Sequence, residues 1–264
     1  MSEGGPDPRF SQSLERGLSV LACFNAIQPV RGIADLADEL GLSRSSTHRY
    51  VVTLTELGYL EQLDDRRYRL GLGVIDLGFS SLVSTGLGEL ARPHLAALRD
   101  RAALTVSLAV LDGHDIIYLE RLRGRPSKRS AVELAIDPGS RLPAHCTALG
   151  KVLLAHLSAP EQQQLLSSAR LARHAPNTIT TNGALREELG RVRAQGLAVD
   201  DEELAPGLLA IAAPVHDDSD EVLAAIDITA EVTTTSLAEF LYTLGGPLIQ
   251  AAAEISKSLG HRRE

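Results

Sequence analysis

The chain has 264 residues, a net charge of −8 and a hydrophobic share of 44%, which is enough apolar material for two folded domains. Its acidic balance counts against a nucleic-acid-binding protein, and no apolar run reaches the ~20 residues that span a bilayer, so we expect no membrane contact. The two cysteines, Cys23 and Cys146, show no disulfide or metal-binding spacing, which suits a reducing cytoplasm. Residues 1–10 are rich in Pro and Gly, lack a signal-peptide pattern and are expected to form a disordered leader.

Two short helices joined by a tight turn are predicted after a first helix over residues 11–25. The segment from Ile33 to Leu40 carries apolar residues at helical spacing. Gly41 then supplies the turn, because glycine takes a positive φ at little cost, and Ser43 caps the next helix by accepting an early backbone N–H bond. The inward face of this second helix is expected to consist of Thr47, Tyr50, Val51, Leu54 and Leu57.

The helix pair and a following hairpin over residues 59–70 are typical of a winged helix-turn-helix DNA-binding domain. A helix that enters the major groove needs short polar and basic side chains near its N-terminus, because those reach bases and phosphates first. The returning strand, residues 66–70, carries arginines that would lie along the phosphate backbone. The residues expected to contact DNA are Arg44, Ser45, Ser46, Thr47, His48, Arg49, Arg66, Arg67 and Arg69.

The charge of this region keeps two alternatives open: a helical hairpin with ordinary surface arginines, and a winged helix that binds protein. Residues 1–80 hold eight arginines and eleven acidic residues, for a net charge of −3. Only the clustering of arginines on two adjacent elements favours DNA. We therefore expect weak DNA affinity from one copy of the chain, which implies a dimer.

The spacing of apolar residues changes from helical to strand-like at Thr105. A joint and a short helix over residues 74–81 precede this change, and we place the domain boundary between residues 72 and 88. The predicted strands cover residues 105–111, 116–122, 130–136, 197–200, 208–216 and 222–229; the predicted helices cover residues 89–101, 152–156, 160–169, 185–194 and 233–259. This order predicts an α+β domain with five or six mainly antiparallel strands and helices on one side.

These joined features resemble the IclR family of bacterial transcription regulators, from about Ser11 to Leu259. In the first domain the matching motifs are SLERGL from Ser13, GLSRSSTHR from Gly41, LGYL from Leu57 and YRLG from Tyr68. In the second domain they are GSRLPAH from Gly139, GKVLLA from Gly150 and GLAVD from Gly196, with Glu203 and Gly207. The stretch from Arg141 to Gly150 is most similar to the PcaR/PobR-type branch, which regulates aromatic-acid and β-ketoadipate pathways.

The resemblance implies a winged helix-turn-helix over residues 11–72, a helical linker over 73–88 and a GAF-like α/β effector-binding domain over 89–264. It implies a cytoplasmic homodimer, or a dimer of dimers, that binds double-stranded DNA at a palindromic operator. It implies neither enzymatic activity nor a cofactor. The effectors of such proteins are small organic or aromatic acids, bound in a cleft of the second domain.

The effector pocket of the family falls, position by position, on Ala131, Leu134, Cys146, Thr147, Ala148, Leu149, Ala210, Asp227 and Thr229. We add Arg129, which adjoins a strand lining this pocket, and His145 as a hydrogen-bonded residue of its wall. The start of the helix at Gly150 suits a carboxylate, because it offers free N–H groups and a favourable dipole. Asp227 stands where relatives often have a small hydroxyl residue; its carboxylate would repel an anion unless protonated, and it suits a hydroxylated aromatic better.

Three other interpretations concern the second domain. His145 and Cys146 suggest a metal site or a thiol–imidazole pair, but no third ligand is spaced nearby, so we expect no metal. Glu202 and Glu203 suggest paired catalytic carboxylates, but an acidic surface loop explains them more simply. An enzyme using His145, Cys146 and Asp227 lacks any known catalytic motif and leaves residues 33–69 unexplained. A regulator of glyoxylate- or pyruvate-type metabolism is the alternative within the family.

Overall fold

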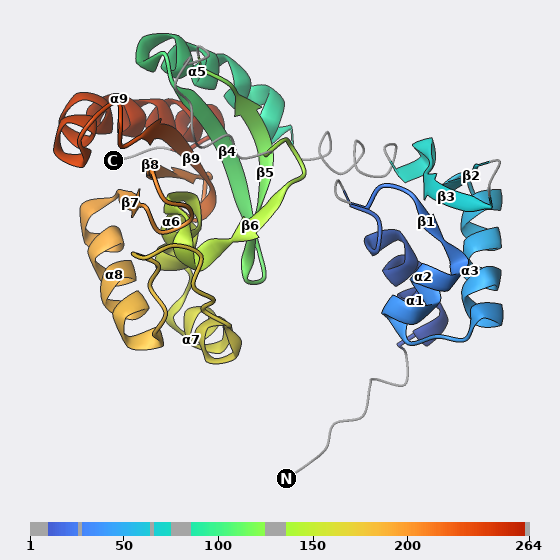
Figure 1. Ribbon diagram of the computed structural model, residues 1–264. Coiled ribbons are helices and arrows are strands. Elements are labelled where there is room, and N and C mark those ends of the chain that lie inside the picture. Colours follow the sequence, from blue (N-terminus) through green and yellow to red (C-terminus); the bar gives the residue numbers. More distant parts are fainter. Residues whose placement is uncertain (1–9, 26–27, 64–65, 75–85, 125–135, 262–264) are drawn as a thin grey trace. The chain divides into compact units, whose positions relative to one another are not determined.

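The computed structural model describes residues 10–25, 28–63, 66–74, 86–124 and 136–261, and divides the chain into two compact units, Met1–Ser84 and Thr85–Glu264 (Figure 1). Several predictions lie outside the described residues: most of the leader, residues 75–85 of the linker predicted over 73–88, residues 130–135 of the third strand predicted over 130–136, and the pocket residues Arg129, Ala131 and Leu134. None of the helices in the described ranges is long and apolar enough to cross a lipid bilayer.

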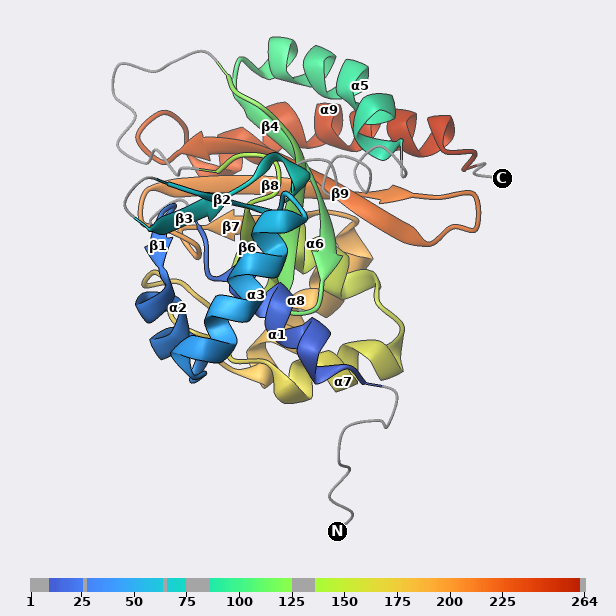
Figure 2. The same cartoon turned by 90° about the vertical axis from the view of Figure 1, so that its right-hand side faces the viewer.

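The first unit is a three-helix domain with a small antiparallel sheet (Figure 2). Its helices are α1 (Gln12–Ala22), α2 (Ile33–Leu40) and α3 (Arg44–Glu56). The sheet has the order β1-β3-β2, formed by β1 (Arg31–Gly32), β2 (Leu60–Gln62) and β3 (Arg67–Leu70). The predicted turn is confirmed, because Gly41 ends α2 with φ at 63° and the Ser43 hydroxyl accepts a hydrogen bond from the Ser46 amide at 3.2 Å.

Two details of the first unit differ from the sequence-based expectation. Leu57 was expected on the inward face of the second helix, but its side chain is 62% exposed because the helix ends at Glu56 and the chain turns outward. Strand β1 was not predicted, since two residues are too short for an alternating pattern. The core is closed instead by residues of all three helices and the wing, including Val20, Leu36, Val51 and Tyr68.

The second unit contains a six-stranded antiparallel sheet in the order β6-β5-β4-β9-β8-β7. Its strands are β4 (Thr105–Asp112), β5 (Asp115–Leu122), β6 (Arg141–Pro143), β7 (Ala198–Asp201), β8 (Leu208–His216) and β9 (Val222–Glu231). The expected hairpin turns between β4 and β5 and between β8 and β9 are present. Strand β6 occupies a stretch that was expected to be a loop.

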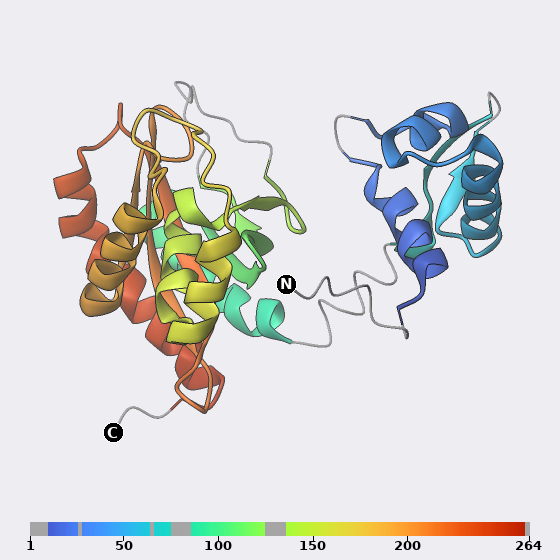
Figure 3. The same cartoon turned by 90° about the horizontal axis from the view of Figure 1, so that it is seen from below.

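Helices cover both faces of this sheet, so the expected one-sided arrangement is wrong (Figures 1 and 3). On one face lie α5 (Leu87–Ala102) and α9 (Leu237–Ser258); on the other lie α6 (Ala148–His156), α7 (Ala159–Ser168) and α8 (Asn182–Gln195). The physical reason is that the central strands are apolar on both sides: nearly every residue of β8 is buried. Small side chains such as Ala210 and Ala212 face the α6 side, which lets that helix approach closely.

The start of α6 depends on one glycine. Thr147 caps the helix by accepting a hydrogen bond from the Gly150 amide at 3.1 Å, so the helix begins four residues before the expected Val152. A Cβ atom at Gly150 would lie 2.2 Å from the carbonyl oxygen and 2.3 Å from the Cα of Ala144, which follows β6 in a short 3-10 turn. Only glycine fits this contact between two backbones.

Gly150→Ala is therefore expected to lower the free energy of unfolding by about 3 kcal/mol, because the added methyl group overlaps backbone atoms that cannot move aside. Gly190→Ala in α8 is the matched control: nothing lies within 4 Å of its Cβ position, so higher helix propensity should raise stability by about 1 kcal/mol. Urea unfolding measures both. Equal effects of the two substitutions would contradict the close approach at Gly150.

Candidate DNA-binding surface and effector pocket

The N-terminal turns of α3 present most of the predicted DNA-binding side chains to solvent. Arg44, Ser45, His48 and Arg49 are exposed, and no acidic residue occupies the first turn. The positive end of the helix dipole adds to the basic side chains here and favours phosphate. Thr47 does not belong to this surface: it is fully buried and its hydroxyl donates to the Ser43 carbonyl at 3.1 Å.

The wing places its arginines on one side of β3. Arg67 and Arg69 are exposed, while Tyr68 between them is buried in the core, as strand alternation requires. The guanidinium of Arg69 donates to both carboxylate oxygens of Glu61, its cross-strand partner, at 2.9 Å each. Part of the positive charge of the wing is therefore already neutralised within the protein.

The second site is a small polar cavity between the sheet and the start of α6. Its floor consists of two neighbouring cross-strand rows: Arg121–Ser107–Asp227, and Thr229–Ala210–Asp200. Side chains two residues apart on a strand share a face, so both rows point toward α6. The cavity is lined by Tyr118, Arg121, Ile136, Thr147, Ala148, Asp200, Leu204, Leu208, Ala210, Asp227 and Thr229.

Five of the residues predicted for the effector pocket thus come together: Thr147, Ala148, Ala210, Asp227 and Thr229. Cys146 and Leu149 are buried in the adjoining core and line none of the described cavities. His145 points elsewhere, into a separate cavity of about 410 Å³ next to α7. The enzyme hypothesis requires His145, Cys146 and Asp227 at one site. The structure does not bring them together, because His145 and Asp227 line different cavities.

Three polar residues of the cavity were not predicted. Tyr118 and Arg121 lie on β5, and the Arg121 guanidinium donates to the Ser107 hydroxyl at 3.2 Å while lying 5.8 Å from the centre of the Tyr118 ring. Asp200 was placed at the end of the predicted strand over residues 197–200 but was not assigned to the pocket. The strand alternation that places it on the same face as Ala198 was the signal available in the sequence.

Asp227 carries an unused acceptor into this cavity. Its side chain is buried, its Oδ2 accepts a long hydrogen bond from Thr229 at 3.5 Å, and its Oδ1 has no hydrogen-bond partner among the described residues. Burial raises the pKa of Asp227 to about 6, despite the opposing effects of Arg121 and Ser107. Burial also raises the pKa of Asp200 to about 7, although two backbone amides donate to its carboxylate.

A buried ion pair lies beside the cavity. The ammonium group of Lys151, on α6, contacts the carboxylate of Glu203 and lies 3.6 Å from that of Glu188, on α8. Glu203 is buried, so the expectation that it belongs to a surface loop is wrong. Its backbone also joins the network, because its amide donates to Asp200 and its carbonyl accepts from the Thr178 hydroxyl at 2.6 Å.

His145 and Cys146 are joined by a third residue that sequence spacing did not reveal. His174 follows 28 residues after Cys146, yet the ligand atoms of the three residues lie within 4.8 Å of one another. The expectation that no third ligand lies near is therefore corrected. Nε2 of His145 lies 3.0 Å from the Ala172 carbonyl, and burial raises the pKa of the Cys146 thiol to about 12. These residues could hold a transition-metal ion once the thiol lost its proton.

A winged helix-turn-helix, followed by an α/β unit with a buried polar cavity, defines a transcription regulator that carries its own sensor domain. The same class follows from sequence comparison: residues 13–64 match the IclR helix-turn-helix domain, and residues 79–257 match the C-terminal domain of the bacterial transcriptional regulator IclR. The chain belongs to the IclR family of bacterial transcriptional regulators.

Relatives of known name cover nearly the whole chain. The regulator XynR of Escherichia coli is 33% identical over 95% of this chain and 98% of its own length. The Pca regulon regulatory protein of Pseudomonas putida is 33% identical over 96% of this chain and 86% of its own length. The crystal structure of an IclR homologue from Microbacterium hydrocarbonoxydans, complexed with 4-hydroxybenzoate, is 27% identical with a TM-score of 0.80, covering 94% of this chain and 99% of that one.

The raised pKa of Asp227 predicts a pH-dependent difference in stability between the wild type and Asp227→Asn. An acid whose pKa is higher in the folded state binds more protons there, so its ionisation lowers wild-type stability as the pH rises from about 4 to 6. We expect Asp227→Asn to match the wild type at pH 4 and to exceed it by about 1–3 kcal/mol at pH 8.

Denaturant unfolding at a series of pH values measures this difference. Asp200 is present in both proteins, so its contribution to the pH dependence of stability cancels when the two are compared. Asp218→Asn, at an exposed position of the turn between β8 and β9, is the control that removes a carboxylate outside the cavity. If the difference in the free energy of unfolding between Asp227→Asn and the wild type does not change with pH, then burial does not raise the pKa of Asp227.

Proposed function

We propose that the protein is a cytoplasmic, dimeric regulator that binds a palindromic operator through α3 and the wing, and that it senses a small hydroxylated aromatic acid in the cavity at the start of α6. The observation that carries the effector proposal is the unpartnered Oδ1 of Asp227, one strand away from Ser107 and two from Arg121. A ligand hydroxyl can donate to Asp227, and a ligand carboxylate can accept from Arg121.

The start of α6 also suits a ligand that carries a carboxylate at one end. Thr147 and Ala148 line the cavity, and the dipole of a helix favours negative charge at its N-terminus. The neighbouring Tyr118 ring and the side chains of Leu204, Leu208 and Ile136 offer apolar contact to an aromatic ring. A hydroxyl at one end and a carboxylate at the other match the polar groups of this site better than an aliphatic keto acid does. The 4-hydroxybenzoate complex of a relative is consistent with this ligand class.

The cavity must widen before such a ligand can enter. Its volume of about 20 Å³ is room for about one water molecule. The described conformation therefore corresponds to a closed pocket. Ligand binding has to separate side chains of the sheet from those of α6, which gives the regulator two conformations that a ligand can distinguish.

The DNA-binding part of the proposal is tested by gel shift of the full-length protein on its upstream DNA. Arg44→Ala and Arg49→Ala are each expected to weaken binding about tenfold, because each removes a charged contact to DNA. Glu61→Gln should strengthen binding about threefold, because it frees Arg69 for phosphate. Glu56→Gln, at the exposed end of α3, removes the same charge without freeing an arginine and serves as the control.

If Glu61→Gln and Glu56→Gln bind DNA equally well, then Arg69 does not contact DNA. If neither arginine of α3 affects binding, the winged helix does not read the groove, and the alternative of a protein-binding winged helix gains support.

The effector is tested by thermal shift with protocatechuate, 4-hydroxybenzoate, benzoate, β-ketoadipate, pyruvate and glyoxylate. A native-state ligand at a hundred times its Kd adds about 2.7 kcal/mol of stability, so a hydroxylated aromatic acid should raise the Tm clearly. Benzoate should shift the Tm less, because it leaves Asp227 unpartnered.

Two variants assign the polar ends of the ligand. Arg121→Gln should weaken the binding of 4-hydroxybenzoate and of benzoate to the same extent. Asp227→Asn should reduce the preference for 4-hydroxybenzoate over benzoate. A Tm shift with pyruvate or glyoxylate alone would place the protein in another branch of the family and overturn the aromatic proposal.

A further inference from the structure

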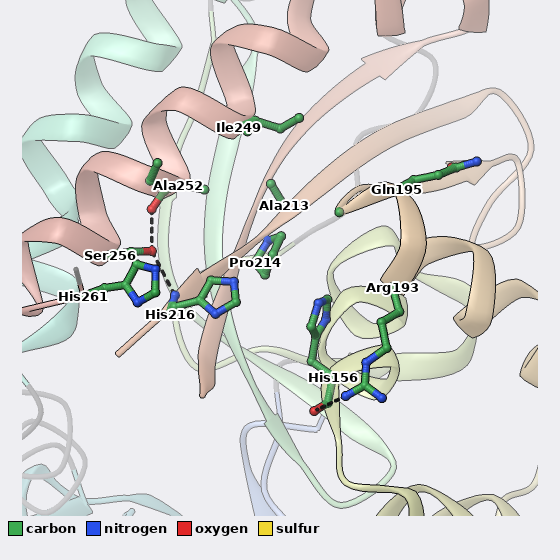
Figure 4. Close-up of a pocket in the computed structure, with 12 residues that line it drawn as sticks. His156, Arg193, Gln195, Ala213, Pro214, His216, Ile249, Ala252, Ser256 and His261 are labelled. Carbon is green, nitrogen blue, oxygen red and sulfur yellow. Dashed lines mark hydrogen bonds between the residues drawn. The ribbon is translucent and has the colours of Figure 1, made fainter. Parts of the chain in front are cut away.

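A third cavity, of about 270 Å³, lies where β8 extends beyond its edge partner. Strand β7 pairs with β8 only up to Ala212, so among the described residues no strand pairs with Ala213 to His216 on that side. The ends of α6 and α8 and one side of α9 surround the gap (Figure 4). None of the residues that line this cavity lines the effector pocket.

Four basic side chains from different elements converge on this cavity: His156, Arg193, His216 and His261 (Figure 4). The rings of His156 and His216 meet edge to face with centroids 6.1 Å apart, and the rings of His216 and His261 stack at 5.2 Å. Arg193 is held at the rim by a 3.4 Å hydrogen bond to the His156 carbonyl. The residues lining the cavity include no acidic side chain.

The hydrogen bonds of the histidines leave ring nitrogens that can donate to a ligand once the rings are protonated. Nδ1 of His156 lies 2.8 Å from the Val152 carbonyl and donates to it, which leaves Nε2 for another partner. Nδ1 of His216 lies 3.2 Å from the Asp220 carbonyl. The Asp220 carboxylate lies 3.4 Å from His216 and 3.7 Å from His261, but it is 79% exposed and does not line the cavity. It can stabilise protonated rings without blocking an anion.

Protection of the open strand edge does not require these basic groups. Pro214 has no N–H to expose, and the His216 amide already donates to the Ser256 hydroxyl at 2.9 Å. Most of the remaining wall is apolar, formed by Ala213, Pro214, Ile249, Ala252 and Ala253, and it is completed by Gln195, Gly196 and Ser256. A cationic rim above an apolar wall matches a molecule with one charged end and a small hydrocarbon body.

We propose that this cavity is a second ligand site, which binds a small organic carboxylate with a compact apolar body. The carboxylate accepts charge-assisted hydrogen bonds from Arg193 and from Nε2 of His156 or His216. Its hydrocarbon part lies on the alanines and Pro214. The volume is slightly below the usual range for drug-sized ligands, so the ligand has only a few carbon atoms.

Binding at this site is coupled to proton uptake. Burial lowers the pKa of His156, and the neighbouring charges of His216 and Arg193 lower it further, against the Val152 carbonyl. The unliganded ring of His156 therefore favours the neutral form, and a bound carboxylate favours the protonated form. The charged groups nearest the three rings are Arg193, at the rim, and the carboxylate of Asp220, beside His216 and His261. Affinity should therefore rise as the pH falls.

The probe for the experiment is isobutyrate, added to the full-length protein. Calorimetry should show at least tenfold tighter binding at pH 6 than at pH 8, with proton uptake detectable by changing the buffer. NMR signals of the His156, His216 and His261 rings, assigned through single His→Gln variants, should shift, whereas those of His145 and His174 should not. Inorganic phosphate should bind at least tenfold more weakly, because it has no apolar part.

Variants distinguish binding in this cavity from binding elsewhere on the protein. Arg193→Gln should weaken isobutyrate binding about tenfold, whereas Arg186→Gln, at an exposed position of the same helix, should leave it unchanged. Arg121→Gln in the effector pocket should also leave it unchanged. The proposal fails if Arg121→Gln abolishes binding, if Arg193→Gln behaves like Arg186→Gln, or if phosphate binds as tightly as isobutyrate.

Discussion

The buried contact between Lys151 and Glu203 determines where the polar cavity of the second unit can form. Lys151 belongs to α6, and Glu203 follows β7; the backbone of Glu203 also binds Asp200 and the Thr178 hydroxyl. One residue thus joins α6, the edge of the sheet and the segment before α8. A charge removed from water is costly, and loss of one partner of such a pair leaves the other uncompensated, at about 3–5 kcal/mol. The pair therefore fixes α6 against the sheet beside Asp200 and Asp227.

Much of the architecture could be predicted from short-range sequence signals. Gly41 and Ser43 define the turn and cap of the helix pair through local backbone chemistry, and the polar turns between apolar strands define both hairpins. Pocket residues on regular strands, such as Asp227 and Thr229, followed from the resemblance because strand register preserves their face. The burial of strands on both faces was missed, although the near-continuous apolar run of β8 was the signal for it in the sequence.

The parts that sequence could not give are those that depend on distant segments. Thr47 was expected both on the inward face of the second helix and among the DNA contacts; its burial in the packed domain confirms the first expectation and contradicts the second. His174 approaches Cys146 only because the chain after α7 returns past the 3-10 turn. Arg121 lies in the predicted strand over residues 116–122, but the sequence does not show how that strand is paired; its register opposite Ser107 is what brings Arg121 to Asp227. Each of these depends on tertiary contacts, for which residue type alone carries no signal.

The closed state of the polar cavity has a consequence for selectivity. If only a fraction of molecules is open, the apparent Kd of every ligand is weakened by that fraction: an open population of about 1% weakens it about a hundredfold. The free energy of opening is the same for all ligands, so it acts as a threshold. Small metabolites that make one or two polar contacts do not offset it, whereas a ligand that satisfies Asp227, Arg121 and the apolar wall together does. Under the proposed function, abundant small acids that make few contacts in the cavity therefore leave the regulator unoccupied.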